Sequence, residues 1–270
     1  MSYKFFSFRD PSGQNVEQWS TRSVEGEIQS CAGRTLENIF KRHLNPPPAK
    51  ILEAGCGLGG WVYYLKNLGY DVVGLEYDPA VVAQVQAYDA DTPVIQGDIF
   101  DLQFEDNSFH TYISLGVVEH FEEGPQVPLK EAYRVLEPGG LGFFTVPYET
   151  WFRKLFSHPL RNLYFFLRKI LKGGNVYFWE YRYSKKDMIR FLEDAGFEII
   201  DVDIDDYVFS DPKHHIGLYA DFFFLRDQEE IWALNGLGRF LRRVFKIFSP
   251  WFYCSGIHIV VRKPEKPVHE

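Results

Sequence analysis

The sequence has few cysteines and no long hydrophobic run, and both scarcities limit what the protein can be. Its three cysteines, Cys31, Cys56 and Cys254, lie far apart in 270 residues, which suits a reducing compartment better than a disulfide framework. No cysteine–histidine spacing indicates a metal site. No apolar run approaches the ~20 residues that span a bilayer, and MSYKFFSFRDPSG lacks the cationic-then-apolar pattern of a signal peptide. We therefore expect a cytoplasmic protein.

Acidic residues are absent from two stretches of an otherwise acidic chain. The net charge is −8, yet residues 150–179 and 231–264 each contain six Lys or Arg and no Asp or Glu. Both repeat apolar residues every three to four positions, which is typical of basic amphipathic helices. Such helices either pack their apolar face on the core or contact a membrane surface or a lipid-bearing substrate, here through 151–172 and 239–252. Because the overall charge is acidic and no base-reading module is present, we expect no nucleic-acid partner.

What the sequence does have is a glycine loop within Ile51-Leu-Glu-Ala-Gly-Cys-Gly-Leu-Gly-Gly60. A short apolar run enters the loop and a helix-like segment, 61–68, leaves it. Glycine permits positive φ and close approach of a ligand, and the following helix offers free N–H groups. The loop fits a dinucleotide pattern through Gly55, Gly57 and Gly60, and a pattern of S-adenosylmethionine (SAM) enzymes through Gly55, Gly57 and Gly59. Taken alone, it leaves both cofactors open.

Two acids further along the chain favour a single adenosine. Tyr70–Glu76 is predicted to be a second strand, and Glu76 lies about twenty residues beyond the loop, where an acid can accept from both ribose hydroxyls. Val94–Ile99 is predicted to be a third strand with Asp98 near its end, beside the position of an adenine amine. A dinucleotide site has no particular need of Asp98. Two more strands are predicted, at 109–115 and at 141–146 after the turn 137–140.

These segments resemble the core of a class I SAM-dependent methyltransferase of the small-molecule type. The matching pieces, in order, are ILEAGCGLGG, VVGLEYDP, GDIFDLQFEDNSF, SLGVVEHF and RVLEPGG, all within 51–147. The resemblance implies an α/β fold with a Rossmann-like, seven-stranded, mostly parallel sheet, an antiparallel last strand and helices on both faces. It implies a domain over 50–270 with helical cap insertions near 151–179 and 207–254, preceded by a helical cap segment, 1–49. It also implies SAM as cofactor and S-adenosylhomocysteine as product.

The resemblance assigns cofactor contacts to particular positions of this chain. They are Glu53, Gly55, Gly57, Gly59, Glu76, Tyr77, Asp98, Ile99 and Leu115. Arg34 or Trp19 could in addition reach the carboxylate of SAM. His110 stands where many relatives carry an acid at the start of the fourth strand, and we interpret it as a structural substitution.

The cofactor also suggests a mechanism, because a sulfonium methyl is already an activated electrophile and needs positioning more than covalent catalysis. A hydroxyl acceptor would benefit from a general base. The candidates at the carboxyl ends of the strands are Glu119, His120 and Tyr148. Candidate substrate contacts are Tyr181, Arg182, His214 and His215. We therefore predict methyl transfer to a small-molecule or lipid-linked acceptor, at oxygen.

Two other hypotheses stay open at this point. An NAD-dependent oxidoreductase would share the glycine loop, although its sheet would then need an antiparallel last strand. A non-catalytic protein that binds membrane surfaces would use the basic helices, although an intact glycine loop and both acids favour cofactor binding.

Overall fold

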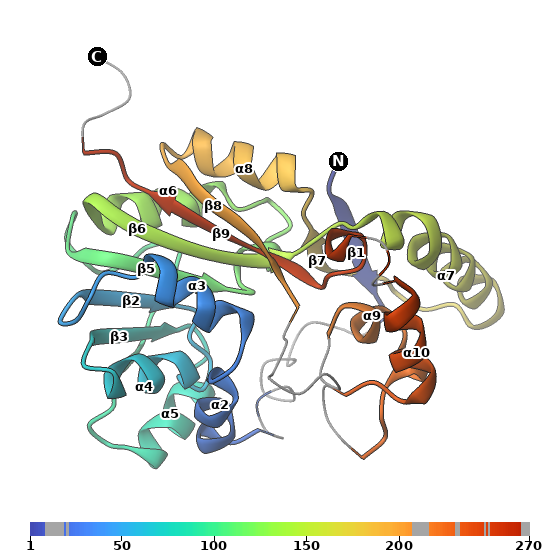
Figure 1. The fold of residues 1–270 in the computed structure, drawn as a ribbon, viewed down its shortest axis with the longest axis horizontal. Helices are drawn as coiled ribbons and strands as arrows, with labels where there is room; N and C mark the ends of the chain where they lie inside the picture. Colours follow the sequence, from blue (N-terminus) through green and yellow to red (C-terminus); the bar gives the residue numbers. More distant parts are fainter. Residues whose placement is uncertain are drawn as a thin grey trace.

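The computed structural model describes residues 1–8, 19, 22–206, 216–229, 233–245, 247 and 249–265 of the chain. Its centre is a seven-stranded sheet of order β4-β3-β2-β5-β6-β9-β8 (Figure 1). The strands are β2 (Lys50–Ala54), β3 (Asp71–Glu76), β4 (Val94–Gln96), β5 (Phe109–Leu115), β6 (Leu136–Pro147), β8 (Glu198–Asp205) and β9 (Gly256–Arg262). β2 to β6 are parallel, whereas β9 is antiparallel to both β6 and β8. The predicted sheet, including its antiparallel last strand, is confirmed.

Helices cover both faces of this sheet. One face is covered by α2 (Val24–Cys31), α3 (Thr35–His43), α4 (Gly60–Asn67) and α5 (Pro79–Tyr88). The other is covered by α6 (Gln126–Val135) and α8 (Lys185–Asp194), and the short helix η1 (Val118–His120) follows β5. Local sequence sets where α5 begins, because the Asp78 side chain accepts from the Ala80 N–H and Pro79 occupies the first turn.

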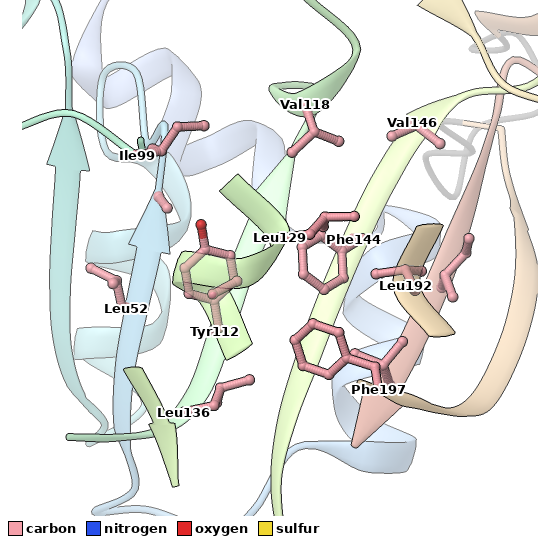
Figure 2. Packing of buried hydrophobic residues seen from close by; sticks show 14 of the residues in the cluster. Leu52, Ile99, Tyr112, Val118, Leu129, Leu136, Phe144, Val146, Leu192 and Phe197 are labelled. Carbon is pink, nitrogen blue, oxygen red and sulfur yellow. The ribbon is translucent and has the colours of Figure 1, made fainter. Parts of the chain in front are cut away.

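The core on the α6–α8 face is aromatic at its centre (Figure 2). Tyr112 on β5 and Phe144 on β6 are fully buried and lie 5.8 Å apart between ring centroids. Leu129 of α6 and Leu192 of α8 belong to the same core and cover these rings on this face of the sheet. Because alternate side chains of a strand point to opposite faces, the neighbours of these residues fill the second core under α2 to α5. The two cores leave the carboxyl ends of the strands to the loops.

The N-terminal segment contains a strand that the sequence pattern did not predict. β1 (Tyr3–Ser7) pairs with β7 (Tyr177–Arg182) in a separate two-stranded antiparallel sheet. Both segments are rich in aromatic residues, which favour extended backbone once a partner strand is present. That partner lies about 175 residues away, so local periodicity in 1–49 could not reveal it. The helices α2 and α3 account for the helical part of the segment.

The remaining helices form a cap beyond the carboxyl end of β6, beside β1 and β7 (on the right in Figure 1). They are η2 (Arg153–Ser157, one π-helical turn), α7 (His158–Lys172), α9 (Ile216–Asp221), η3 (Phe223–Leu225), α10 (Gly236–Phe245) and η4 (Pro250–Phe252). Most of the cap has its own small core, which includes Phe152, Leu218 and Tyr253. α7 is different, because His158 is its only buried residue.

A buried carboxylate ties the cap to the sheet. Asp221 at the end of α9 accepts from Arg153 Nε at 2.8 Å and from Arg182 Nη1 at 2.5 Å, and all three side chains are almost fully buried. Burial alone would raise the pKa of the Asp221 carboxyl, but the two guanidinium groups hold it far below its ordinary value. The Arg153 guanidinium also donates to the backbone oxygens of Tyr148 and Ser255. The insertions are therefore fixed to β6 and β7 and are not free appendages.

Candidate active site

The glycine loop between β2 and α4 has the left-handed backbone that its sequence predicts. φ is 80° at Gly55, 53° at Gly57 and 72° at Gly59, and Gly59 is the N-cap of α4. A Cβ at Gly55 would lie 2.5 Å from a methyl group of Val117, and one at Gly57 would lie 2.6 Å from the Trp19 ring. The loop therefore requires glycine both for its conformation and for space.

A cavity of about 420 Å³ opens beside this loop, at the carboxyl ends of β3, β4 and β5. Its lining residues are Trp19, Gly55, Glu76, Tyr77, Asp98, Ile99, Phe100, Gly116, Val117, His120 and Phe121. We call it the adenosine cavity, because it brings together the two acids that the sequence assigned to ribose and adenine. Polar groups sit beside apolar walls there, as expected of a pocket for a nucleoside.

The two acids of the adenosine cavity are held by backbone N–H groups. Glu76 accepts from Gly57 N–H at 2.9 Å through one oxygen and from Asp78 N–H at 3.0 Å through the other. Each carboxylate oxygen keeps a second lone pair for a ribose hydroxyl. Asp98 accepts from Phe100 N–H at 2.9 Å, which turns the chain after β4 and leaves its other oxygen without a hydrogen bond among the described residues. Both side chains are thus fixed in place by the protein alone.

A second cavity of about 330 Å³ adjoins the first, because Trp19, Gly55 and Gly116 line both cavities. We call it the polar cavity, because its lining includes many charged or polar side chains: Arg22, Glu27, Arg34, Glu53, Thr145, Asp205 and His258. Leu115, predicted as a cofactor contact, lines it too. Because charges of both signs line this cavity, it suits a zwitterion such as the amino-acid end of SAM.

Glu53 is a buried acid of the polar cavity with one oxygen unsatisfied among the described residues. Its side chain is 4% exposed, and this oxygen is Oε2. Burial raises the pKa of the Glu53 carboxyl to about 8, from an ordinary 4.5. A buried acid with a free oxygen beside a cavity is poised to pair with an ammonium group, and the charged pair would bring this pKa down again.

Replacing Glu53 by glutamine should change how stability depends on pH. The raised pKa means that folded wild-type protein keeps a proton that the unfolded chain releases above about pH 4.5. The free energy of unfolding of the wild type therefore falls by up to about 1.4 kcal/mol per pH unit as pH rises toward 8. The Glu53→Gln variant should not show this fall, because glutamine does not titrate. Urea unfolding of both proteins at several pH values measures the difference. Parallel pH dependences would show that Glu53 is already ionised in the folded protein.

The three candidate bases lie in different surroundings. His120 lines the adenosine cavity, and its Nδ1 is 2.9 Å from the backbone oxygen of Trp179. Glu119 is 2% exposed, burial raises the pKa of its carboxyl to about 7, and its Oε2 has no hydrogen-bond partner among the described residues. Tyr148 packs edge-on against Trp251 and lines neither cavity. The structure thus brings only His120 to the cavity wall.

The candidate substrate residues do not gather at either cavity. Tyr181 donates its hydroxyl to the Glu122 backbone oxygen at 2.9 Å, and the Arg182 guanidinium is committed to Asp221 and Glu180. Neither lines a cavity. The buried charge of Arg182 is already paired within the protein. His214 and His215 lie outside the described residues.

Two further residues noted in the sequence, His110 and Cys56, have plain structural surroundings. The Nδ1 of His110 accepts from Lys50 N–H at 3.1 Å, so this histidine secures the start of β2, as its interpretation as a structural substitution predicts. Burial raises the pKa of the Cys56 thiol well above its ordinary value, so that thiol stays protonated. In the part of the chain that the structure describes, no group of three His, Cys, Asp or Glu could hold a metal ion. Within the same residues no helix is long and apolar enough to cross a membrane.

Sequence reasoning missed several residues of the two cavities. Phe100 and Phe121 supply apolar walls of the adenosine cavity and meet edge-on, with ring centroids 4.6 Å apart. Thr145 and Asp205 lie at or near the carboxyl ends of β6 and β8, a position that could have marked them. His258 lies on the antiparallel strand β9, where no such rule applies.

Comparison with known proteins agrees with this geometry. Residues 52–144 match the family model of the methyltransferase domain. The chain carries a class I SAM-dependent methyltransferase domain. SAM is the cofactor that this family implies, and the site fits it: the adenosine cavity holds two fixed acids, and the polar cavity beyond Gly55 holds a buried carboxylate with an oxygen left over.

Three similar proteins place this methyltransferase domain among its relatives. A probable SAM-dependent methyltransferase of Mycolicibacterium smegmatis is 30% identical over 151 residues, which is 56% of this chain and 52% of that protein. A demethylmenaquinone methyltransferase of Staphylococcus aureus is 28% identical over 62% of this chain and 75% of that one. A SAM-dependent methyltransferase of Methanosarcina mazei has the same fold, with a TM-score of 0.57 and 17% identity over 84% of this chain and 98% of that one. The chain thus spans about half the length of the first relative.

Proposed function

We propose that the protein transfers the methyl group of SAM to a hydroxyl oxygen of a small-molecule or lipid-linked acceptor. The observation that carries the oxygen acceptor is the orientation of His120. The Trp179 backbone oxygen can only accept a hydrogen bond, so Nδ1 of His120 carries the proton. Nε2 is then the acceptor nitrogen of the ring, on a side chain that lines the adenosine cavity. An imidazole in this tautomer can remove the proton of a hydroxyl.

Each residue has a defined part in this proposal. SAM, when bound, supplies a sulfonium methyl that a nucleophile can attack directly. Glu76 and Asp98 would hold the adenosine, and the opposite charges of Glu53 and Arg34 suit the ammonium and carboxylate of the methionine portion. His120 would accept the hydroxyl proton as the oxygen–methyl bond forms and the sulfur–methyl bond breaks, with S-adenosylhomocysteine as the leaving group. Most of the remaining rate enhancement would come from fixed orientation.

The class of acceptor is proposed on two supports. One similar protein is named for demethylmenaquinone, a quinone, and this name supports a lipid-linked acceptor, whereas the choice of oxygen rests on His120 alone. The cap also leaves large apolar side chains exposed, which suits an acceptor with a lipid portion. We accordingly propose that the protein works in the cytoplasm and at the periphery of a membrane.

The test combines binding with product detection. Calorimetry with SAM and S-adenosylhomocysteine should show binding of both, and mass spectrometry should find a methylated product after incubation of the protein and SAM with a metabolite and lipid extract. The Glu76→Ala variant is the control for product formation. Tighter binding of NADH than of SAM would favour the oxidoreductase hypothesis instead. Binding of SAM without any methylated product would leave the cofactor site and remove the proposed reaction.

A further inference from the structure

Helix α7 is attached to the protein by the side that carries its cations. The Arg161 guanidinium lies 3.5 Å from the ring centre of Phe5, and that of Arg168 lies 4.0 Å from the ring centre of Phe8. Phe165, between them on the same side of the helix, packs on Phe8 with ring centroids 4.6 Å apart. These contacts, with the buried His158, define the inner side of α7.

The apolar arc of α7 therefore points away from the protein. Side chains three to four positions apart lie on one side of a helix, and those opposite the inner side are all between 47% and 78% exposed. They are Leu160, Leu163, Phe166, Leu167, Ile170 and Leu171, which we call the α7 face. A helix of 15 residues is about 22 Å long. An uninterrupted apolar surface of this length normally marks a binding site.

A second helix at the same end of the molecule, α10, also leaves apolar side chains exposed (Figure 1). α10 packs Leu241 and Phe245 against the core of the cap. Its neighbouring stripe, Leu237, Phe240 and Val244, stays exposed. The sequence left open whether the basic amphipathic helices pack on a core or contact a membrane or lipid-bearing substrate. α10 packs partly on the core of the cap, whereas the apolar side of α7 packs on no core that the described residues form.

Charge decides which partner suits this end of the molecule. Arg153 is buried against Asp221, and Arg262 and Lys263 lie at the opposite end of β9. The cations at this end that are neither buried nor stacked on Phe5 or Phe8 include Lys154, Lys169 and Lys172 beside or on α7 and Arg239, Arg242 and Arg243 on α10. A second copy docked symmetrically on the α7 face would bring these cations against themselves. An anionic lipid surface offers the opposite charge together with an apolar layer below it, which is what a basic amphipathic helix requires. Trp151, which is 64% exposed, lies at the start of the helical segment that continues through η2 into α7, and its ring suits the headgroup level.

We propose that the α7 face inserts into the surface of an anionic membrane, with Lys169 and Lys172 of the last turn of α7 and the arginines of α10 on the headgroups. Trp179 lies on β7, the strand that follows α7 in the chain. The Trp179 backbone oxygen accepts a hydrogen bond from His120 at the adenosine cavity. Membrane binding thus brings the site close to acceptors that reside in the bilayer. This last consequence rests on the proposed function, whereas the binding itself does not.

Vesicle sedimentation with the full chain tests the proposal. Binding should be strong to phosphatidylcholine vesicles that contain about one third phosphatidylglycerol, weak to pure phosphatidylcholine, and reduced by salt. A Leu167→Glu/Ile170→Glu variant should bind at least tenfold more weakly. The matched control is Leu68→Glu/Val127→Glu, which places the same charges at exposed apolar positions beside α4 (Leu68) and on α6 (Val127). This control should bind like the wild type.

Three results would overturn the proposal. They are absence of binding to anionic vesicles, equal binding by both double variants, and a dimer in light scattering that Leu167→Glu/Ile170→Glu dissociates, since a second copy would then cover the face. Calorimetry with SAM on the same samples keeps the two proposals apart. Loss of vesicle binding with SAM affinity unchanged concerns the α7 face alone, and loss of SAM binding concerns the proposed function.

Discussion

Replacing His120 by alanine is expected to lower the rate of methyl transfer by about 10²–10⁴-fold, the usual contribution of a general base. SAM affinity should change much less, because Glu76 and Asp98 hold the adenosine independently of the imidazole. The measurement is a single-turnover rate with the acceptor found by the product search, together with calorimetry for SAM. A loss of rate at nearly constant affinity would assign the proton transfer to this histidine.

The His120→Asn and His110→Ala variants complete this experiment. Asparagine can still donate to the Trp179 backbone oxygen, so it tests whether the bond to β7 or the free ring nitrogen matters. His110 is also exposed, but it bonds Lys50 at the other end of the strands. Its replacement should leave the rate unchanged. Full activity of His120→Ala would show that orientation suffices, or that the buried Glu119 supplies the base.

Replacing Glu76 by alanine should weaken SAM binding by about 10²–10³-fold. Two hydrogen bonds from ribose hydroxyls to a carboxylate are worth about 1.5 kcal/mol or more each, and each 1.4 kcal/mol is tenfold in affinity. The same carboxylate holds Gly57 N–H and Asp78 N–H, so its loss also frees the glycine loop. Calorimetry gives the affinity, and thermal unfolding without ligand gives the effect on the fold.

Glu105→Ala is the matched control for that variant, since this exposed acid lies just before a turn and outside both cavities. It should bind SAM as the wild type does. Glu76→Gln should fall between the two, because an amide has only one oxygen for the bonds that the carboxylate shares between two. Unchanged affinity in Glu76→Ala would place the ribose elsewhere and overturn the assignment of the adenosine cavity.

The sheet and the cofactor acids could be predicted because their signals are local. Each parallel strand is a short apolar run, and ligands lie at the carboxyl ends of such strands, so Glu76 and Asp98 could be placed by position alone. The glycine loop added a backbone requirement that the φ values confirm. All of this information lies within 51–147, where strand, loop and helix follow one another closely.

The rest depended on contacts between distant parts of the chain. The partner of Arg182 is Asp221, on a helix that the sequence did not pair with it. The strand β1 depends on β7, which is equally remote. Periodicity showed that α7 has an apolar side, but not which side would meet the protein. The cation-bearing side does so, because Phe5 and Phe8 of the N-terminal segment meet Arg161 and Arg168.

The position of β9 has a consequence for how the chain folds. This strand is the last of the sheet to be synthesised, yet it lies inside the sheet, between β6 and β8. Thr145 on β6 pairs with His258 on β9, 113 residues later. At about 5–20 residues per second, a ribosome needs roughly 6–23 seconds to cover that distance. During this time β6 has an unpaired edge, so the nascent chain passes through a stage open to chaperones or to aggregation.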